Sequence, residues 1–143
     1  ANLGEDLKPI QKIASGGELS RIMLAIRTVT ANQDDIGTLI FDEIDAGISG
    51  KTAWKVSEKL GILGRTHQII CITHLPQIAA MADHHFYIEK NATDHSTATT
   101  ITELSEADSL KELARLSGAA QLTESVLANA KEMKDLAEKK KQN

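Results

Sequence analysis

The fold is decided by the stretch Thr38-Leu39-Ile40-Phe41-Asp42-Glu43. Its first four residues form a short, continuous apolar run, which is typical of a strand buried on both faces in a parallel sheet. A second such run, His67 to Thr73, predicts a second buried strand. Helical patterns flank both runs. We therefore expect an α/β fold with buried parallel strands, flanking helices and further helices at the C-terminal end.

Helices are predicted where apolar residues recur every three or four positions. The clearest pattern predicts a helix over 17–31, and Ser15 with Glu18 has the spacing of a capping box at its start. Weaker patterns predict helices over 51–63, 76–82, 106–116 and 120–140, and a hairpin with strands at 84–89 and 97–104.

Composition limits the classes of protein that this chain can belong to. Its 143 residues suit one ordinary domain, and 41% apolar with 25% charged residues is typical of a globular protein. The net charge of −4 offers no general basic surface for nucleic acid, so any DNA contact needs a local patch or another part of the protein. One cysteine, Cys71, excludes an internal disulfide. No apolar stretch approaches the ~20 residues that span a bilayer, so we expect a cytoplasmic protein.

Two adjacent carboxylates, Asp42 and Glu43, follow the first predicted strand. Ligands of open α/β sheets bind at the carboxyl ends of the strands, and a rigid strand would fix both acids there. Successive side chains on extended backbone diverge, so the acids can have different roles. Asp42 can hold Mg²⁺, and Glu43 can orient and deprotonate an attacking water. A solvated turn after a strand is the alternative.

The segment Ser15-Gly16-Gly17-Glu18 opens the first predicted helix. Two glycines at a helix N-terminus let backbone N–H groups approach an anion, and the helix dipole favours negative charge there. Ser15 adds a hydroxyl donor. This pattern suits a phosphate, although an ordinary capped helix has the same residues.

Two further segments follow the predicted strands. Thr73-His74 would place an imidazole at the carboxyl end of the second strand, and Asp45 to Gly50 is a polar loop with two glycines. For each segment the alternative interpretation is an ordinary surface loop with no role in binding. Ser49-Gly50-Lys51-Thr52 imitates the end of a P-loop, but Asp45 stands where that motif needs its first glycine, so we reject it.

In this order and spacing, these segments resemble the second half of an ATP-binding-cassette ATPase, a P-loop NTPase type of head. Ser15 to Glu18 resembles the signature motif, Leu39 to Glu43 the Walker B strand, Asp45 to Gly50 the D-loop, and His74 the switch histidine. The wording Thr73-His74-Leu75-Pro76-Gln77 is similar to the SMC-like branch of DNA repair ATPases.

The resemblance implies a site shared by two heads, in which ATP lies between the Walker A loop of one head and the signature motif of the other. Ser15 and Gly17 would bind the γ-phosphate of the opposite head's ATP, and Gly16 and Glu18 would belong to the same ATP-binding segment. Asp45 would help to couple the two sites across the interface. The cofactors implied are ATP and Mg²⁺.

The same resemblance gives the remaining residues their roles. Asp42 would help to hold Mg²⁺, Glu43 would position the attacking water, and His74 would sense the γ-phosphate. Cycles of head engagement would then act on DNA in recombinational repair.

The chain departs from the family pattern because it contains no Walker A loop. Its expected partners are therefore the N-terminal Walker A half of the same protein and a second head in a homodimer, with DNA contacted only through the longer protein and no membrane. We expect the isolated chain neither to bind ATP tightly nor to hydrolyse it. Two alternatives stay open, which are a non-catalytic dimerisation or regulatory module with this fold and the half-head of a transporter.

Overall fold

The computed structural model describes residues 9–10, 13–30, 36–93 and 96–142, with the side chains of 92–93 and 96–97 left out of the description. The chain divides after His74 into two compact units, and each is described by itself. Within the described residues, no helix is both long and apolar enough to cross a membrane.

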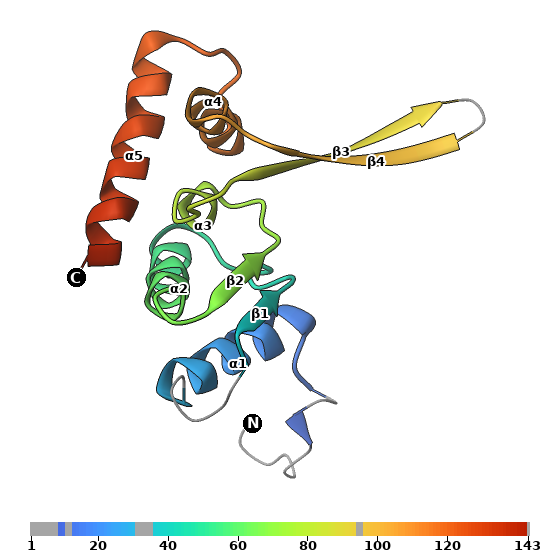
Figure 1. Cartoon of the computed structure of the whole chain (residues 1–143), viewed down its shortest axis with the longest axis vertical. Coiled ribbons are helices and arrows are strands. Elements are labelled where there is room, and N and C mark those ends of the chain that lie inside the picture. Colours follow the sequence, from blue (N-terminus) through green and yellow to red (C-terminus); the bar gives the residue numbers. More distant parts are fainter. Residues whose placement is uncertain (1–8, 11–12, 31–35, 94–95, 143) are drawn as a thin grey trace. The chain divides into compact units, whose positions relative to one another are not determined.

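The first unit contains two helices and two strands, α1 (Gly16–Thr30), β1 (Thr38–Phe41), α2 (Gly50–Leu63) and β2 (Gln68–Cys71) (Figure 1). The strands pair in parallel, as the sequence predicts, with the first residue of β1 opposite the first of β2. A parallel pair needs a crossover connection, and α2 supplies it. The second strand has four residues rather than the predicted seven.

Burial of the two strands is one-sided, which corrects the expectation that both faces are covered. Phe41 is 3% exposed, whereas its neighbour Ile40 is 68% exposed and Ile70, which pairs with Ile40, is 45% exposed. Successive strand residues point to opposite faces, so one face packs into the core and the other stays open. The core side is made with buried residues of α1, α2 and the loop after β1, namely Leu24, Ile44, Ala53, Val56, Leu60 and Leu63.

The second unit contains three helices and a hairpin, α3 (Pro76–Ala79), β3 (Phe86–Thr93), β4 (Ser96–Glu103), α4 (Glu106–Leu116) and α5 (Glu124–Gln142) (Figure 1). The hairpin is antiparallel, with Phe86 opposite Glu103. Two predicted helices are shorter than expected, since α3 ends at Ala79 and α5 begins at Glu124.

Local capping explains the boundaries of α4. Ser105 Oγ accepts a hydrogen bond from Asp108 N at 3.2 Å and donates one to Asp108 Oδ2 at 2.7 Å, a reciprocal cap at the helix start. Gly118, with a φ of 84°, follows the helix end in the left-handed conformation that glycine adopts at low cost.

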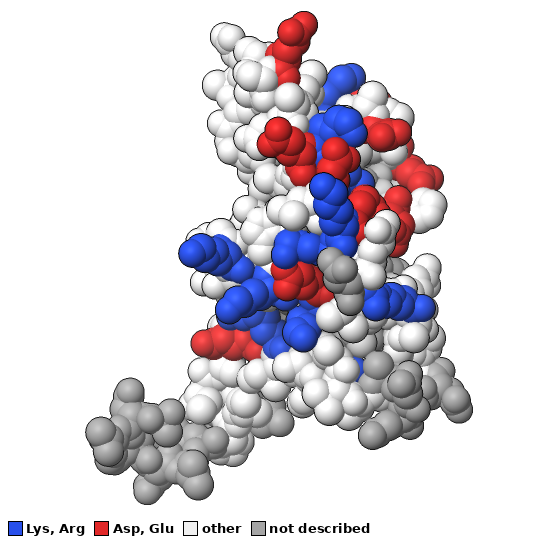
Figure 2. All heavy atoms as spheres, turned by 90° about the vertical axis from the view of Figure 1, so that its left-hand side faces the viewer, with Lys and Arg blue, Asp and Glu red and all other residues white. Residues whose placement is uncertain are grey.

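Charges in the second unit are largely paired along its own helices. Lys111 pairs with Asp108 at 2.7 Å and Arg115 pairs with Glu112 at 2.6 Å. Lys131 pairs with Asp135, four residues further along α5, at 3.2 Å. The upper part of Figure 2, where α4 and α5 lie, shows acidic and basic side chains interleaved.

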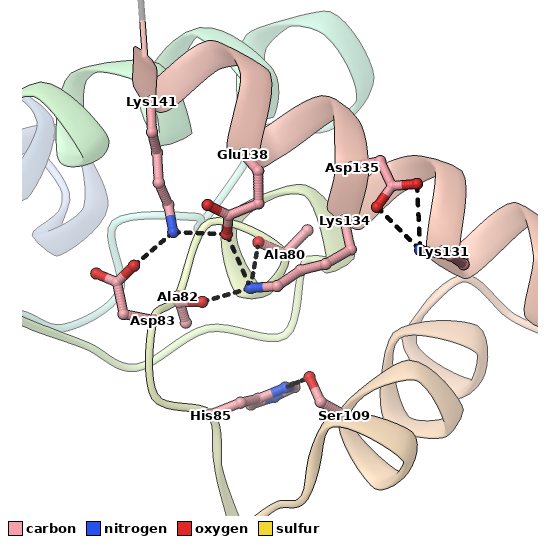
Figure 3. Close-up of polar contacts among 10 residues, drawn as sticks. All are labelled: Ala80, Ala82, Asp83, His85, Ser109, Lys131, Lys134, Asp135, Glu138 and Lys141. Atoms are coloured by element: carbon pink, nitrogen blue, oxygen red, sulfur yellow. Dashed lines mark hydrogen bonds and ion pairs between the residues drawn. The ribbon is translucent and has the colours of Figure 1, made fainter.

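Two lysines of α5 hold the segment that follows α3 (Figure 3). Lys134 Nζ donates to the carbonyl oxygens of Ala80 at 3.1 Å and Ala82 at 2.5 Å. Lys141 Nζ bridges Asp83 at 2.6 Å and Glu138 at 2.9 Å. Burial lowers the pKa of Lys141, but its hydrogen bonds to these two carboxylates outweigh that effect and raise the pKa overall.

His85 lies next to the segment held by these lysines. Its Nδ1 is 2.8 Å from Ser109 Oγ of α4 (Figure 3). Burial lowers the pKa of His85, so the neutral ring is favoured in the folded chain. His84 instead pairs with Glu103 at 2.7 Å, so the two adjacent histidines have separate partners.

We predict that Lys134→Met destabilises the chain by about 2 kcal/mol, since two backbone carbonyls lose a charged donor at a side chain only 26% exposed. Lys131→Met on the same helix is the control, because its ion pair is exposed and worth less than about 0.5 kcal/mol. Urea unfolding of both variants measures the difference. Equal losses would show that the carbonyl contacts of Lys134 do not stabilise this segment.

Candidate functional site

A capping box forms at the start of α1, as the sequence predicts. Ser15 N and Oγ both donate to Glu18 Oε2, at 2.8 and 2.9 Å, and Glu18 N donates back to Ser15 Oγ at 3.3 Å. The hydrogen bonds from the Ser15 backbone and side chain lower the pKa of Glu18. In this conformation the Ser15 hydroxyl caps the helix and donates to Glu18, so it must rotate before it can donate to a ligand.

The two glycines of α1 lie against the segment that follows β1. A Cβ atom added at Gly17 would lie 2.7 Å from the carbonyl oxygen of Glu43 and 2.8 Å from Cβ of Ala46. One added at Gly16 would collide with Oε2 of Glu43. Glycine is therefore required at Gly17, where the neighbour is backbone, whereas at Gly16 the neighbour is the movable end of the Glu43 side chain. The predicted phosphate motif directly adjoins the predicted catalytic carboxylate.

Two polar residues one turn further along α1 hold this approach. Ser20 Oγ donates to the carbonyl oxygen of Asp42 at 2.8 Å. Arg21 Nη1 donates to those of Ile44 at 3.1 Å and Ala46 at 2.8 Å. The sequence analysis gave Ser20 and Arg21 no role. The signal was their spacing, because positions three and four after Gly17 share its face of the helix.

Glu43 adopts an unusual backbone conformation, with a φ of 56°. It is the one residue other than glycine with positive φ among the described residues. The left-handed region is costly for a side chain with Cβ and is found at functional sites when its surroundings enforce it. Asp42 Oδ1 accepts a hydrogen bond from Glu43 N at 2.8 Å and helps to fix this turn. Both carboxyl groups belong to exposed residues, so a ligand can reach them.

Asp45 is buried, with 4% of its surface exposed, and its carboxylate turns inward to the segment after β2. Oδ2 accepts hydrogen bonds from Thr73 Oγ1 at 2.6 Å and from His74 N at 2.8 Å. The same oxygen lies 2.9 Å from His74 Nδ1. A buried carboxylate needs such hydrogen bonds, and both of them come from consecutive residues, Thr73 and His74. Sequence reasoning did not foresee the contact, since 28 residues separate Asp45 from Thr73.

Cys71, at the end of β2, is half-buried beside this cluster. Burial raises the pKa of its thiol to about 12, with the negative charges of Asp45 and Asp42 adding to the effect. The thiol is therefore protonated at neutral pH and is not a nucleophile.

All the predicted site residues lie in the first unit, at the start of α1 and just after β1 and β2. The structure brings them together in two contacts, Gly16 and Gly17 against Glu43, and Asp45 against His74. Asp42 is a single exposed carboxylate, and the described residues contain no group of three side chains able to hold a metal by themselves. This donor set fits Mg²⁺ bound together with nucleotide phosphates, because Mg²⁺ takes one or two protein carboxylates and completes its shell from phosphate and water.

Comparison with known proteins identifies close relatives. Proteins named DNA repair protein RecN are 53% identical in Haemophilus influenzae, 49% in Vibrio cholerae and 45% in Bacillus subtilis, over 95%, 92% and 92% of this chain. The chain spans about a quarter of the length of these relatives, 24%, 24% and 23%. No family model matches the chain.

A solved structure gives the fold independently. It comes from work on ATP-driven dimerization and DNA-stimulated activation of SMC ATPases, and it matches 80% of this chain and 68% of its own with a TM-score of 0.52 and 21% identity. At that identity the match bears on fold alone. The α/β fold with parallel strands is thus shared with this SMC ATPase structure, which confirms the predicted fold class.

We predict that Glu43→Gly leaves the chain about 1 kcal/mol more stable than Glu43→Ala, because both remove the carboxylate but only glycine adopts positive φ without steric cost. Urea unfolding of the two variants, compared at the same slope, gives the difference. An alanine variant at least as stable as the glycine variant would show that the Glu43 backbone is not held in this conformation.

Proposed function

Because this chain is homologous to a segment of the RecN DNA repair proteins, we propose that it is the C-terminal half of the ATPase head of a bacterial recombinational DNA repair protein. It would complete ATP sites in trans and drive ATP-dependent engagement of two heads on DNA. In the cell such a protein would be cytoplasmic and associated with the nucleoid when it acts on DNA.

One observation carries this proposal, namely the meeting of three separated segments at the carboxyl ends of β1 and β2. The start of α1 reaches this edge through Arg21, and the segment after β2 reaches it through Asp45. Such an edge is where ligands of α/β sheets bind. A glycine-bearing helix start, two exposed carboxylates and an exposed imidazole are the groups that phosphoryl transfer to water requires.

Glu43 is proposed to orient the attacking water and to accept its proton at a carboxylate oxygen. The positive φ at this residue sets the direction in which its side chain leaves the backbone. Asp42 would hold Mg²⁺, and this ion, when bound, would neutralise charge on the phosphates.

The start of α1 is proposed to bind the γ-phosphate of the opposite head's nucleotide. Backbone N–H groups of Gly16 and Gly17 would donate to phosphate oxygens, helped by the helix dipole. Ser15 would release its bond to Glu18 and donate its hydroxyl to the phosphate, with Glu18 keeping the helix capped through the Ser15 backbone N–H.

His74 is proposed to contact the γ-phosphate of its own head, and Asp45 to couple the two sites. The imidazole is suited to this because its side chain is 71% exposed, whereas the Asp45 side chain is 6% exposed. A phosphate can therefore meet the ring directly, while Asp45 acts through residues of its own chain.

The N-terminal Walker A half of the same protein is the proposed partner for the open face of β1 and β2. Ile40, Ile70 and Ile72 are 68%, 45% and 49% exposed, and apolar strand faces of α/β domains are normally covered on both sides. The remaining three quarters of the relatives' length offers such a segment. A second head would complete the site, and DNA would be contacted through the longer protein.

We predict ATP hydrolysis when this chain is mixed with the N-terminal half, and none by the chain alone. Glu43→Gln should lower turnover by on the order of a hundredfold or more, because general-base catalysis contributes at least that much. Glu132→Gln, an exposed position on α5, is the matched control and should leave turnover unchanged. Phosphate release measures all four reactions.

Two outcomes would overturn the proposal. Hydrolysis by the pure chain would show that the Walker A half is not needed. Association of the halves without any hydrolysis would favour the alternative, a non-catalytic dimerisation or regulatory module that uses the open apolar face.

A further inference from the structure

The carboxylate of Asp45 lies against the ring of His74 as well as its backbone N–H. Asp45 Oδ2 lies 2.9 Å from Nδ1. A carboxylate oxygen only accepts hydrogen bonds, so a bond across this distance needs the proton on Nδ1. In a neutral imidazole the other nitrogen, Nε2, then has a free lone pair. Such a bond would therefore select one of the two neutral forms of the ring.

The accepting oxygen is held in place independently of the ring. Thr73 Oγ1 donates to it at 2.6 Å and His74 N at 2.8 Å. Because Asp45 is almost fully buried, water does not compete for this oxygen as it would at the surface.

We propose that Asp45 is a positioning residue for His74, which fixes the ring with its proton on Nδ1 and presents Nε2 to the nucleotide phosphate. This inference rests on the proposed ATPase function for its purpose, but its geometry stands without nucleotide. Asp45 does not touch the reacting atoms. It acts through the ring, and Thr73 sets the direction of its carboxylate.

The arrangement has a chemical consequence at the phosphate. A fully ionised phosphate oxygen accepts hydrogen bonds but donates none, so a direct bond requires a proton on Nε2 as well. A bond to phosphate therefore places the ring between the Asp45 carboxylate at Nδ1 and a phosphate oxygen at Nε2.

The same contact gives a route for coupling between sites. Asp45 opens the loop that runs to Gly50, where α2 begins, and both glycines of that loop have positive φ, 72° at Gly47 and 51° at Gly50. A partner head that displaced this loop would move the Asp45 carboxylate and, with it, the orientation of the ring.

Nitrogen-15 NMR of labelled histidine in this chain, at mildly alkaline pH and without nucleotide, tests the proposal. We expect His74 with a protonated Nδ1 and a bare Nε2. Asp45→Ala should shift the ring towards the Nε2–H form, and Thr73→Val should do so in part, whereas Thr73→Ser, which keeps the hydroxyl, should not. Glu103→Ala is the matched control, because it removes the exposed partner of His84 and should leave His74 unchanged.

The second arm measures turnover of the same variants mixed with the N-terminal half. Asp45→Ala should lower kcat at least about tenfold, as removal of an outer partner of a functional histidine does, and Thr73→Ser should restore what Thr73→Val loses. If Asp45→Ala does not fold, the comparison of Thr73→Val with Thr73→Ser tests the proposal instead. A wild-type ring protonated mainly on Nε2, or no difference between valine and serine in the spectrum, overturns the proposal.

The two arms separate the two claims. The expected ring form in a chain whose mixed halves never hydrolyse ATP would uphold the positioning role of Asp45 and contradict the proposed function. Hydrolysis by the mixed halves with the His74 ring protonated on Nε2 would uphold the proposed function and contradict the positioning role of Asp45.

Discussion

The buried carboxylate of Asp45 is the contact on which the site depends. It leaves the segment after β1 and accepts the hydroxyl of Thr73 and the backbone N–H of His74 after β2. Parallel pairing aligns the two strand ends, but pairing alone does not fix the segments beyond them. A buried carboxylate with two hydrogen-bond donors does so, and it stays stable when buried because each donor replaces a lost water.

A second constraint acts from the other side of the same edge. The close approach of α1 is possible only because Gly17 has no side chain, and Arg21 then reaches two carbonyl oxygens of the loop. Hydrogen bonds from a charged donor contribute about 1.5–3 kcal/mol each. That is enough to hold Glu43 in a backbone conformation that costs about 1–2 kcal/mol. The hydrogen bonds of Arg21 and the close packing at Gly17 thus connect the start of α1, Glu43 and the loop after β1.

The elements of the fold were largely predictable from the sequence, because apolar periodicity and short apolar runs are local signals. The strand at 38–41 and the helix at 106–116 were predicted at their observed bounds. Boundaries without such signals were missed, as at the start of α5, where Thr123 accepts from Val126 N and the helix begins four residues later than expected. One-sided burial of β1 was also missed, because a run of apolar residues does not say what covers each face.

The candidate site was predictable as a set of residues but not as a set of contacts. The sequence placed Glu43 and His74 at strand ends, which α/β topology brings together, and Gly16 at the start of a helix. Which atom meets which is decided by tertiary geometry. The amino-acid sequence does not indicate that Glu43 has positive φ, or that the Asp45 side chain points towards its own chain.

The central claim is that segments 15–18, 42–45 and 73–74 form one part of a shared ATP site. Hydrogen–deuterium exchange of this chain measures it directly, with the N-terminal half and a non-hydrolysable ATP analogue added separately and together. All three segments are expected to gain protection together, and only when both additions are present with Mg²⁺. Protection confined to the open face around Ile40 and Ile70, with the three segments unchanged, would contradict it.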